Sequence, residues 1–249
     1  MIFRQFLHAD PIAASYLFGC GGRGVCAVVD PIEDIDFYVH AASETRMRIQ
    51  YVIDTHVHAD HVSGGRRLAA AAGTEYVLHA SAATGQTLAV TDRQQLELGN
   101  VIIEVLHTPG HTPEHISLLV SDRARGAEPW MALTGHTLMV GDMGRTELAS
   151  RADHGADMLF ESARRLRELP DHVEVWPGAL AGSVCGRRLS GKAASTIGFE
   201  RRFNRAFATA DRDAFVQLML ADIPPRPADA EENRAANLTA IRCVHAVRR

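Results

Sequence analysis

The chain has 249 residues, of which 46% are hydrophobic, so it is long enough to bury one sizeable core. Its formal net charge is −4, from 26 basic and 30 acidic residues, and without a basic stripe no nucleic-acid-binding surface is indicated. The sequence has no apolar run of about 18 residues and no long apolar signal core at its start, so we expect no membrane span and a cytoplasmic location.

Short segments rich in β-branched residues recur along the chain, which is typical of strands. We predict strands at residues 2–7, 15–18, 25–29, 51–53, 75–79, 101–106, 116–120, 130–133 and 173–176. Apolar spacing and helix-ending residues predict helices at 35–48, 64–72 and 158–169. Runs of strands with helices between them predict an α/β fold, an αββα sandwich with its functional loops along one edge.

A proline-rich segment marks the expected end of this unit. Pro224, Pro225 and Pro227 lie close together, and the sequence after them is polar with helical character. No linker, repeat or low-complexity tract precedes them in the sequence. We therefore expect one domain over residues 1–225 and a helical tail over residues 226–249.

The most informative segment directly follows the predicted strand at 51–53. It reads Thr-His-Val-His-Ala-Asp-His and contains His56, His58, Asp60 and His61. Neutral imidazole is the commonest protein ligand for zinc and iron, and a carboxylate binds a metal or orients a ligand. The density of such groups predicts a metal-binding loop at the end of a strand.

Two later loops carry further imidazoles. The segment Thr-Pro-Gly-His after the strand at 101–106 contains His111, and the segment Thr-Gly-His after the strand at 130–133 contains His136. A repeated order of strand, loop and ligand is how an α/β scaffold collects metal ligands at one edge of its sheets. We expect these histidines to meet the first loop.

These three segments, in this order, resemble the motifs of the metallo-β-lactamase superfamily, whose fold is an αββα sandwich in a single domain. The motifs are THxHxDH, TPGHTPEH and TGxTLxxGDxGR. Within that superfamily the chain is most similar to the persulfide dioxygenases, including those fused to rhodanese domains. The similarity rests on residues 181–186 and 195–202, which follow the last site loop and read AGSVCG and STIGFERR.

The chain departs from the superfamily pattern at two positions. His136 stands where most members have the aspartate that bridges two metals, and Ala179 stands where they have a histidine of the second metal. Two of the ligands that a second metal needs are therefore missing. On this resemblance we do not expect a binuclear zinc hydrolase.

The resemblance implies instead a single non-haem Fe(II) per chain. Its ligands would be His56, His111 and the residue at position 136, which is His136 here. Three neutral nitrogens leave an open face for substrate and oxygen, and they leave one more unit of positive charge on the iron than a set with a carboxylate.

The other members of the first loop are candidate catalytic residues. The resemblance implies that His58, Asp60 and His61 lie near the iron without binding it. Hydrogen bonds to bound water or to a ligand ring are their expected use, because such bonds fix the tautomer and orientation of a ligand. Asp60 is alternatively a base.

Two residues are candidates for substrate binding. Arg145 matches an arginine that the dioxygenase branch places beside its thiol substrate, and a guanidinium suits the carboxylates of glutathione. A structural salt bridge to Asp142 or Glu147 is the alternative. Cys185 lies in a loop that resembles the substrate side of the dioxygenases, where it would carry sulfane sulfur or simply be a small buried thiol.

The resemblance implies oxidation of a small persulfide, such as glutathione persulfide, with O₂ to sulfite and thiol. The alternative from another reaction class is a zinc hydrolase of thioesters or lactones that uses His56, His58 and His111 with water. A third reading is a non-catalytic member inactivated at His136. A homodimer and a rhodanese on a separate chain are the protein partners left open.

Overall fold

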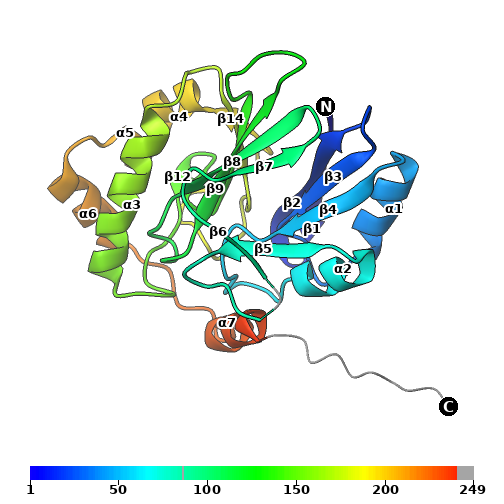
Figure 1. The fold of residues 1–249 in the computed structure, drawn as a ribbon. Helices are drawn as coiled ribbons and strands as arrows, with labels where there is room; N and C mark the ends of the chain where they lie inside the picture. Colours follow the sequence, from blue (N-terminus) through cyan, green and yellow to red (C-terminus); the bar gives the residue numbers. More distant parts are fainter. Residues whose placement is uncertain (86, 240–249) are drawn as a thin grey trace.

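Two β-sheets packed face to face form the centre of the molecule, which the computed structural model describes over residues 1–85 and 87–239 (Figure 1). The first sheet has the order β1-β2-β3-β4-β5-β6. Its strands are β1 (Ile2–Ala9), β2 (Ile12–Cys20), β3 (Val25–Val29), β4 (Arg48–Ile53), β5 (Glu75–His79) and β6 (Leu88–Val90).

The second sheet has the order β14-β13-β10-β9-β8-β7. Its strands are β7 (Gln95–Leu98), β8 (Val101–His107), β9 (Ile116–Asp122), β10 (Met131–Gly135), β13 (Glu174–Pro177) and β14 (Ser195–Thr196). A separate small hairpin follows β10 and consists of β11 (Leu138–Met139) and β12 (Asp142–Met143).

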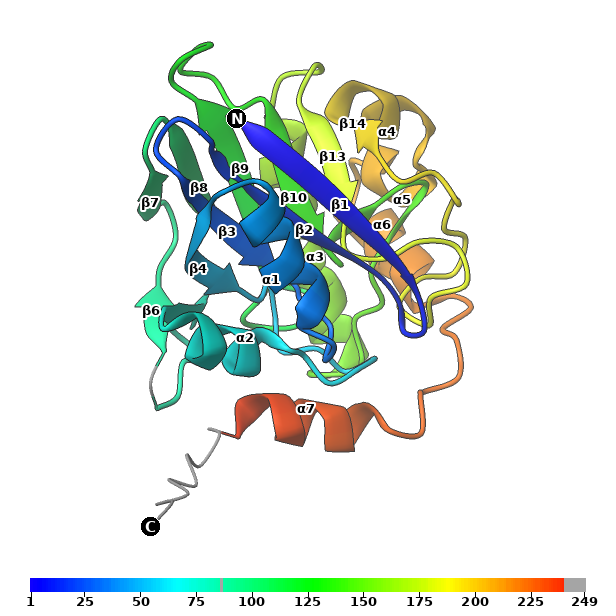
Figure 2. The same ribbon diagram turned by 90° about the vertical axis from the view of Figure 1, so that its right-hand side faces the viewer.

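Helices cover the outer face of each sheet, which completes four layers (Figures 1 and 2). The first sheet is covered by α1 (Asp36–Glu44) and α2 (Gly65–Ala72). The second is covered by α3 (Ala152–Arg167), α4 (Ile197–Phe203), α5 (Arg205–Ala208) and α6 (Arg212–Leu220). The predicted αββα sandwich in one domain is confirmed.

The main core lies between the two sheets. Tyr16, Phe18 and Ile53 reach into it from the first sheet, and Ile103 and Leu118 reach into it from the second. A further apolar cluster lies between each sheet and the helices that cover it. Burial on both faces explains why several strands, such as β2, are apolar without alternation.

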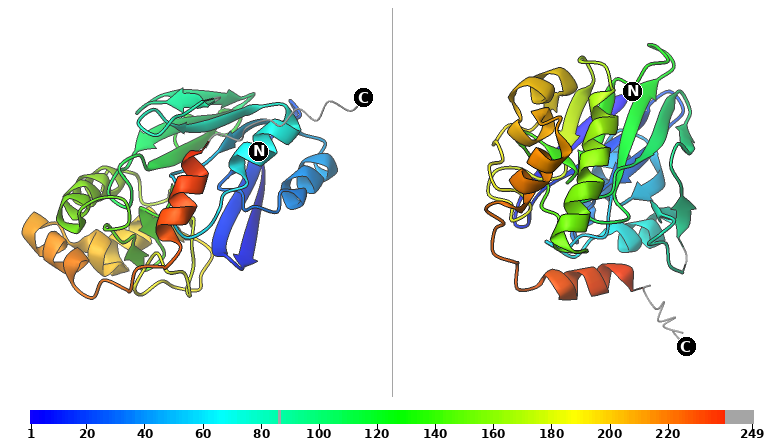
Figure 3. Two further views of the ribbon diagram at one scale, coloured as in Figure 1. Left: turned by 90° about the horizontal axis from the view of Figure 1, so that it is seen from below. Right: turned by 90° about the vertical axis from the view of Figure 1, so that its left-hand side faces the viewer.

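Strand direction brings the motif loops to one edge of the sandwich. Because β8 and β10 both run antiparallel to β9, they run in the same direction as each other. The loops that follow β8 and β10 contain His111 and His136, and the loop that follows β4 contains His56. The last described helix, α7 (Ala230–Leu238), lies across this edge (Figure 3).

Some predicted boundaries were wrong. Helix α1 ends at Glu44 instead of residue 48, because Arg46 has a φ of 54° and turns the chain into β4. Helix α3 begins at Ala152, before the apolar stripe from which we predicted it at residue 158. Its first turns contain Gly155, where a β-carbon would collide with Thr146. The strands β6, β7, β11, β12 and β14 are too short to show a period and were missed.

The C-terminal segment contains a helix, α7, within the tail expected at residues 226–249. Residues 240–249, including Cys243, lie outside the described residues. The boundary at residue 225 stays a prediction. Over the described residues, no helix is both long and apolar enough to cross a membrane.

Candidate metal centre

Three imidazoles from the three motif loops converge at the edge covered by α7. One ring nitrogen each of His56, His111 and His136 lies within 4.8 Å of the others. All three side chains are fully buried. The structure therefore brings together the three residues that the sequence predicted as metal ligands.

A hydroxyl fixes the orientation of His56. Thr55 Oγ1 donates to Asp30 Oδ2 at 2.8 Å, so its remaining partner, His56 Nδ1 at 2.9 Å, is a donor. The lone pair of His56 then lies on Nε2. Within the described part of the chain, buried Nε2 has no hydrogen-bond partner.

A backbone carbonyl orients His111 in the same way. His111 Nδ1 donates to the carbonyl oxygen of Arg145 at 2.8 Å, which places the lone pair on Nε2. That atom lies 3.3 Å from His136 Nδ1. The absence of a side chain at Gly144 permits this approach, since a β-carbon there would collide with the carbonyl of His136.

His136 is held through its backbone. Its N–H donates to His115 Nε2 at 3.0 Å, and the His115 Nδ1 proton is shared with the hydroxyls of Thr108 and Thr137, each at 3.0 Å. His115 therefore supports the loop and is not a candidate ligand. Its role was not recognised in the sequence, although it belongs to the second motif.

The residues fit a divalent metal ion. Buried polar atoms normally have partners, yet several at this centre have none among residues 1–85 and 87–239. Burial lowers the pKa of His56, His111 and His136, that of His111 to about 3, so the rings are in the neutral form that binds metal. The atoms without any such partner include His56 Nε2, His61 Nε2, His136 Nε2 and Asp60 Oδ2, whereas Asp60 Oδ1 lies 3.1 Å from His61 Nδ1 and 3.6 Å from His58 Nδ1.

The candidate catalytic residues form a second group beside the first. Donor atoms of His58, Asp60 and His61 lie within 4.8 Å of one another. Burial opposes the charged form of His58, but the carboxylates of Asp30 at 3.2 Å and Asp60 at 3.6 Å outweigh it and raise its pKa well above the ordinary value. Burial likewise opposes the charge of Asp60, whereas the neighbouring rings of His61 and His58 hold its pKa well below the usual range.

Asp30 connects the two groups and was missed in the sequence. It accepts from the N–H of Thr55 at 2.6 Å and lies 3.2 Å from His58 Nε2. Its backbone has a φ of 50°, and it directly follows β3. An acidic residue at the end of a buried strand was the available signal.

The side chain of Arg145 makes an ion pair and several hydrogen bonds within the protein. Its buried guanidinium forms an ion pair with Glu147 and donates to the carbonyls of Val184 at 2.9 Å, Pro224 at 2.7 Å and Pro225 at 3.2 Å. One of the two salt bridges left open by the sequence is therefore present. The structural alternative is therefore borne out in this ion pair, and contact of Arg145 with a substrate stays a prediction.

Cys185 lies at the centre. Its side chain is fully buried, and its sulfur lies within 4.8 Å of a carboxylate oxygen of Asp60 and a ring nitrogen of His136. Burial raises the pKa of the thiol well above its ordinary value. The expectation of a buried thiol and that of a thiol near the site both fit this position, and contact with a substrate stays a prediction.

Helix α7 holds the first motif loop from outside. Asn237 Nδ2 donates to the carbonyls of His58 and His61, both at 2.9 Å, and Asn237 Oδ1 accepts from the N–H of Ser63 at 2.8 Å. Arg234 donates to the carbonyl of Val57 at 2.8 Å. Nothing in the local pattern of residues 226–249 indicated that the tail would contact the site.

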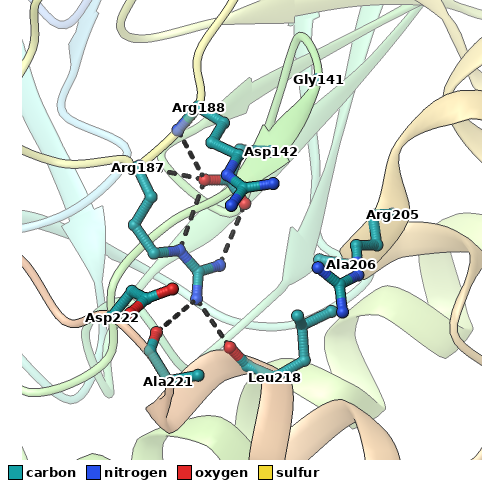
Figure 4. A pocket seen from close by; sticks show the side chains of 9 residues that line it. All are labelled: Gly141, Asp142, Arg187, Arg188, Arg205, Ala206, Leu218, Ala221 and Asp222. Atoms are coloured by element: carbon teal, nitrogen blue, oxygen red, sulfur yellow. Dashed lines mark hydrogen bonds and ion pairs between the residues drawn. The ribbon is translucent and has the colours of Figure 1, made fainter.

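Arg187 and Arg188 follow Cys185 closely in the chain and line a pocket beside Asp142. Figure 4 shows Arg187 directed between Asp142 and the end of α6. It forms an ion pair with Asp142 at 3.0 Å and donates to the carbonyl of Leu218 at 2.9 Å. Arg187 therefore fastens the loop to the helix.

Comparison with known proteins identifies relatives over the whole fold. Residues 10–178 match the sequence profile of the metallo-beta-lactamase superfamily. The mitochondrial persulfide dioxygenase ETHE1 of Bos taurus is 24% identical over 241 residues, which cover 96% of this chain and 88% of that protein. The crystal structure of ETHE1 from Myxococcus xanthus has a TM-score of 0.82 and 29% identity and covers 95% of this chain and 100% of that chain.

A hydrolase is also similar to part of the chain. The hydroxyacylglutathione hydrolase of Rhodospirillum rubrum is 31% identical over 166 residues. The match covers 66% of this chain and 60% of that protein. The similarity to the dioxygenases therefore extends over more of both chains.

Proposed function

This chain belongs to the metallo-beta-lactamase superfamily, and from that membership we propose that it is a mononuclear non-haem iron dioxygenase acting on a low-molecular-weight persulfide. The observation that carries the proposal is the convergence of three neutral imidazole donors from His56, His111 and His136. Similarity to persulfide dioxygenases over 96% of the chain supports it. Glutathione persulfide is the proposed substrate.

The reaction is balanced without a further oxidant. A persulfide, one O₂ and one water give one thiol and one sulfite: the S–S bond breaks, the terminal sulfur loses four electrons, and both oxygen atoms of O₂ gain them. The imidazoles of His56, His111 and His136 would hold the metal. When bound, iron supplies the electron transfer to oxygen and attracts the anionic sulfur.

The protein residues orient the metal ligands, and the burial of the centre excludes water. Thr55 and the Arg145 carbonyl fix the rings of His56 and His111, so the donor lone pairs are set before metal arrives. The low pKa of Asp60 makes it a weak base, and we therefore assign it the acceptance of hydrogen bonds from water or substrate. His58, held between Asp30 and Asp60, keeps its proton.

The test combines metal analysis with oxygen uptake. Protein purified without oxygen is analysed for bound metal, and O₂ consumption is then followed after addition of glutathione persulfide. We expect about one iron per chain and sulfite formed in step with the O₂ consumed. Bound zinc without oxygen uptake, or a centre that does not take up Fe(II), contradicts the proposal.

A zinc hydrolase of thioesters is the second candidate, because the Rhodospirillum rubrum hydrolase is similar to two thirds of the chain. Its metal would need His58 as a ligand in addition to His56 and His111. His58→Ala separates the two candidates. It should spare most bound iron in a dioxygenase, and it should strip zinc and abolish cleavage of a thioester reporter in a hydrolase.

A further inference from the structure

Two charged side chains bind the backbone of Val57, which lies between His56 and His58. The N–H of Val57 donates to Glu114 Oε1 at 3.0 Å, and its carbonyl accepts from Arg234 Nη1 at 2.8 Å. Those two side-chain atoms also lie 3.5 Å from each other and form an ion pair. Glu114 and Arg234 therefore hold one residue of the first motif loop from both sides.

The acceptor of the Val57 N–H is a buried carboxylate. Only 5% of the Glu114 side chain is exposed, and only 2% of Val57 is exposed. A buried N–H needs a partner, and a hydrogen bond to a carboxylate is stronger than one to a neutral oxygen. Loss of this acceptor should therefore displace the backbone at Val57.

Glu114 belongs to the same turn as His111. The N–H of Thr108 donates to the carbonyl of His115 at 2.9 Å and closes this turn at its base. The backbone between these two residues contains both His111 and Glu114. The position of the Glu114 carboxylate is therefore tied to that of the His111 imidazole.

A backbone hydrogen bond runs beside the contact of Glu114. The N–H of Ile116 donates to the carbonyl of Thr55 at 2.8 Å. Together the two hydrogen bonds hold the chain on both sides of His56 against the turn that contains Glu114. Protein groups alone make these contacts, so they can set the distance between the first two motif loops before a metal binds.

We propose that Glu114 is a positioning residue for the metal centre. It fixes the backbone of Val57, and through it the imidazole of His56, relative to His111. The acceptor oxygen carries this role, so the neutral amide oxygen of a glutamine at the same position should serve nearly as well. The inference goes beyond the proposed function, because it holds for any divalent ion and any reaction that the centre serves.

The first test measures the Val57 amide directly, in metal-free protein. Hydrogen exchange followed by NMR reports whether that N–H is hydrogen-bonded. We expect slow exchange in the wild type and in Glu114→Gln, and exchange faster by about 10-fold or more in Glu114→Ala. A Val57 amide that is equally protected in Glu114→Ala overturns the proposal.

The second test measures metal affinity, by competition between the protein and a chelator for Zn²⁺. Glu114→Ala should bind zinc about 10- to 100-fold more weakly than the wild type, and Glu114→Gln should restore most of the loss. Asp122→Ala is the control, since Asp122 is also a buried carboxylate and accepts from the N–H of Ala124 at 3.1 Å. It lies at the end of β9 far from the motif loops, so its loss should leave zinc affinity unchanged.

Rescue by glutamine separates positioning from a general loss of stability. Equal zinc affinity in the wild type and Glu114→Ala, no rescue in Glu114→Gln, or a wild type that binds no zinc overturns the proposal. Should Glu114→Ala fail to fold by circular dichroism, Glu114→Asp replaces it, because the shorter side chain withdraws the acceptor: weaker zinc binding supports the proposal, and unchanged binding refutes it. A wild type that binds zinc but does not oxidise persulfide counts only against the proposed function.

Discussion

Two of the three converging imidazoles are oriented by a protein oxygen, and the third is not. His56 is bound to Thr55, and His111 is bound to the carbonyl of Arg145. His136 makes its firm hydrogen bond through its backbone, to His115. The ring of His136 is therefore the least constrained donor at the centre, at the position where the superfamily usually has a carboxylate.

The hydroxyl of Thr55 should matter for metal affinity. In Thr55→Val the ring of His56 loses the acceptor that sets its tautomer, and Asp30 loses one donor. We expect metal binding weaker by about 10- to 100-fold, measured by competition with a chelator. Thr91→Val, at an exposed position, is the control. Equal affinity in both variants would show that the hydroxyl does not orient the ligand.

Substitutions at position 136 compare a charged donor with the loss of a donor. His136→Asp supplies the donor that the superfamily commonly has and should retain or raise iron content and persulfide oxidation. His136→Ala removes a donor from the group at His56 and His111, so iron content and oxygen uptake should both fall. Metal analysis and O₂ uptake measure both. If His136→Ala keeps its iron and its turnover, the three-histidine centre is wrong.

At the scale of elements, α7 acts as a brace on the first motif loop. Asn237→Ala removes the donors to two buried carbonyls, those of His58 and His61. We expect a loss of about 1–3 kcal/mol in the free energy of unfolding and faster metal release. Denaturant unfolding and metal exchange measure these effects, with Glu232→Ala on the exposed side of the same helix as the control. Identical behaviour of the two variants would mean that the brace is not needed.

The sequence predicted those parts of the site in which a metal-binding residue directly follows a recognisable strand. His56, His111 and His136 each follow an apolar strand, so their placement at one sheet edge could be predicted from neighbouring residues. Asn237 lies 174 residues from Ser63, whose N–H it binds, and no local pattern reports such a contact. The proximity of Cys185 to His136 was equally hidden, because a loop without a period determines it.

At the scale of the whole molecule, the candidate metal ligands come from both halves of the sandwich. His56 follows β4 of the first sheet, and His111 and His136 follow β8 and β10 of the second. A bound metal therefore links the two sheets at one edge, in addition to the apolar core between them. Binding and global stability should be coupled.

Removal of metal should lower the melting temperature. At a metal concentration 100-fold above Kd, binding stabilises the folded state by about 2.7 kcal/mol, which corresponds to roughly 5–10 °C for a chain of this size. Calorimetry of metal-loaded and chelator-treated protein tests this, and His56→Ala should show little further change on chelation. Equal melting temperatures for the two wild-type forms would mean that the metal does not couple the sheets.

The position of α7 also bears on the order of events during synthesis. The loop with His56 and His58 leaves the ribosome before Asn237, which donates to the His58 carbonyl from 179 residues further along the chain. Domains form as the chain emerges from its N-terminus. The strands of both sheets therefore emerge before the loop acquires its brace, so the centre matures only after α7 has been synthesised.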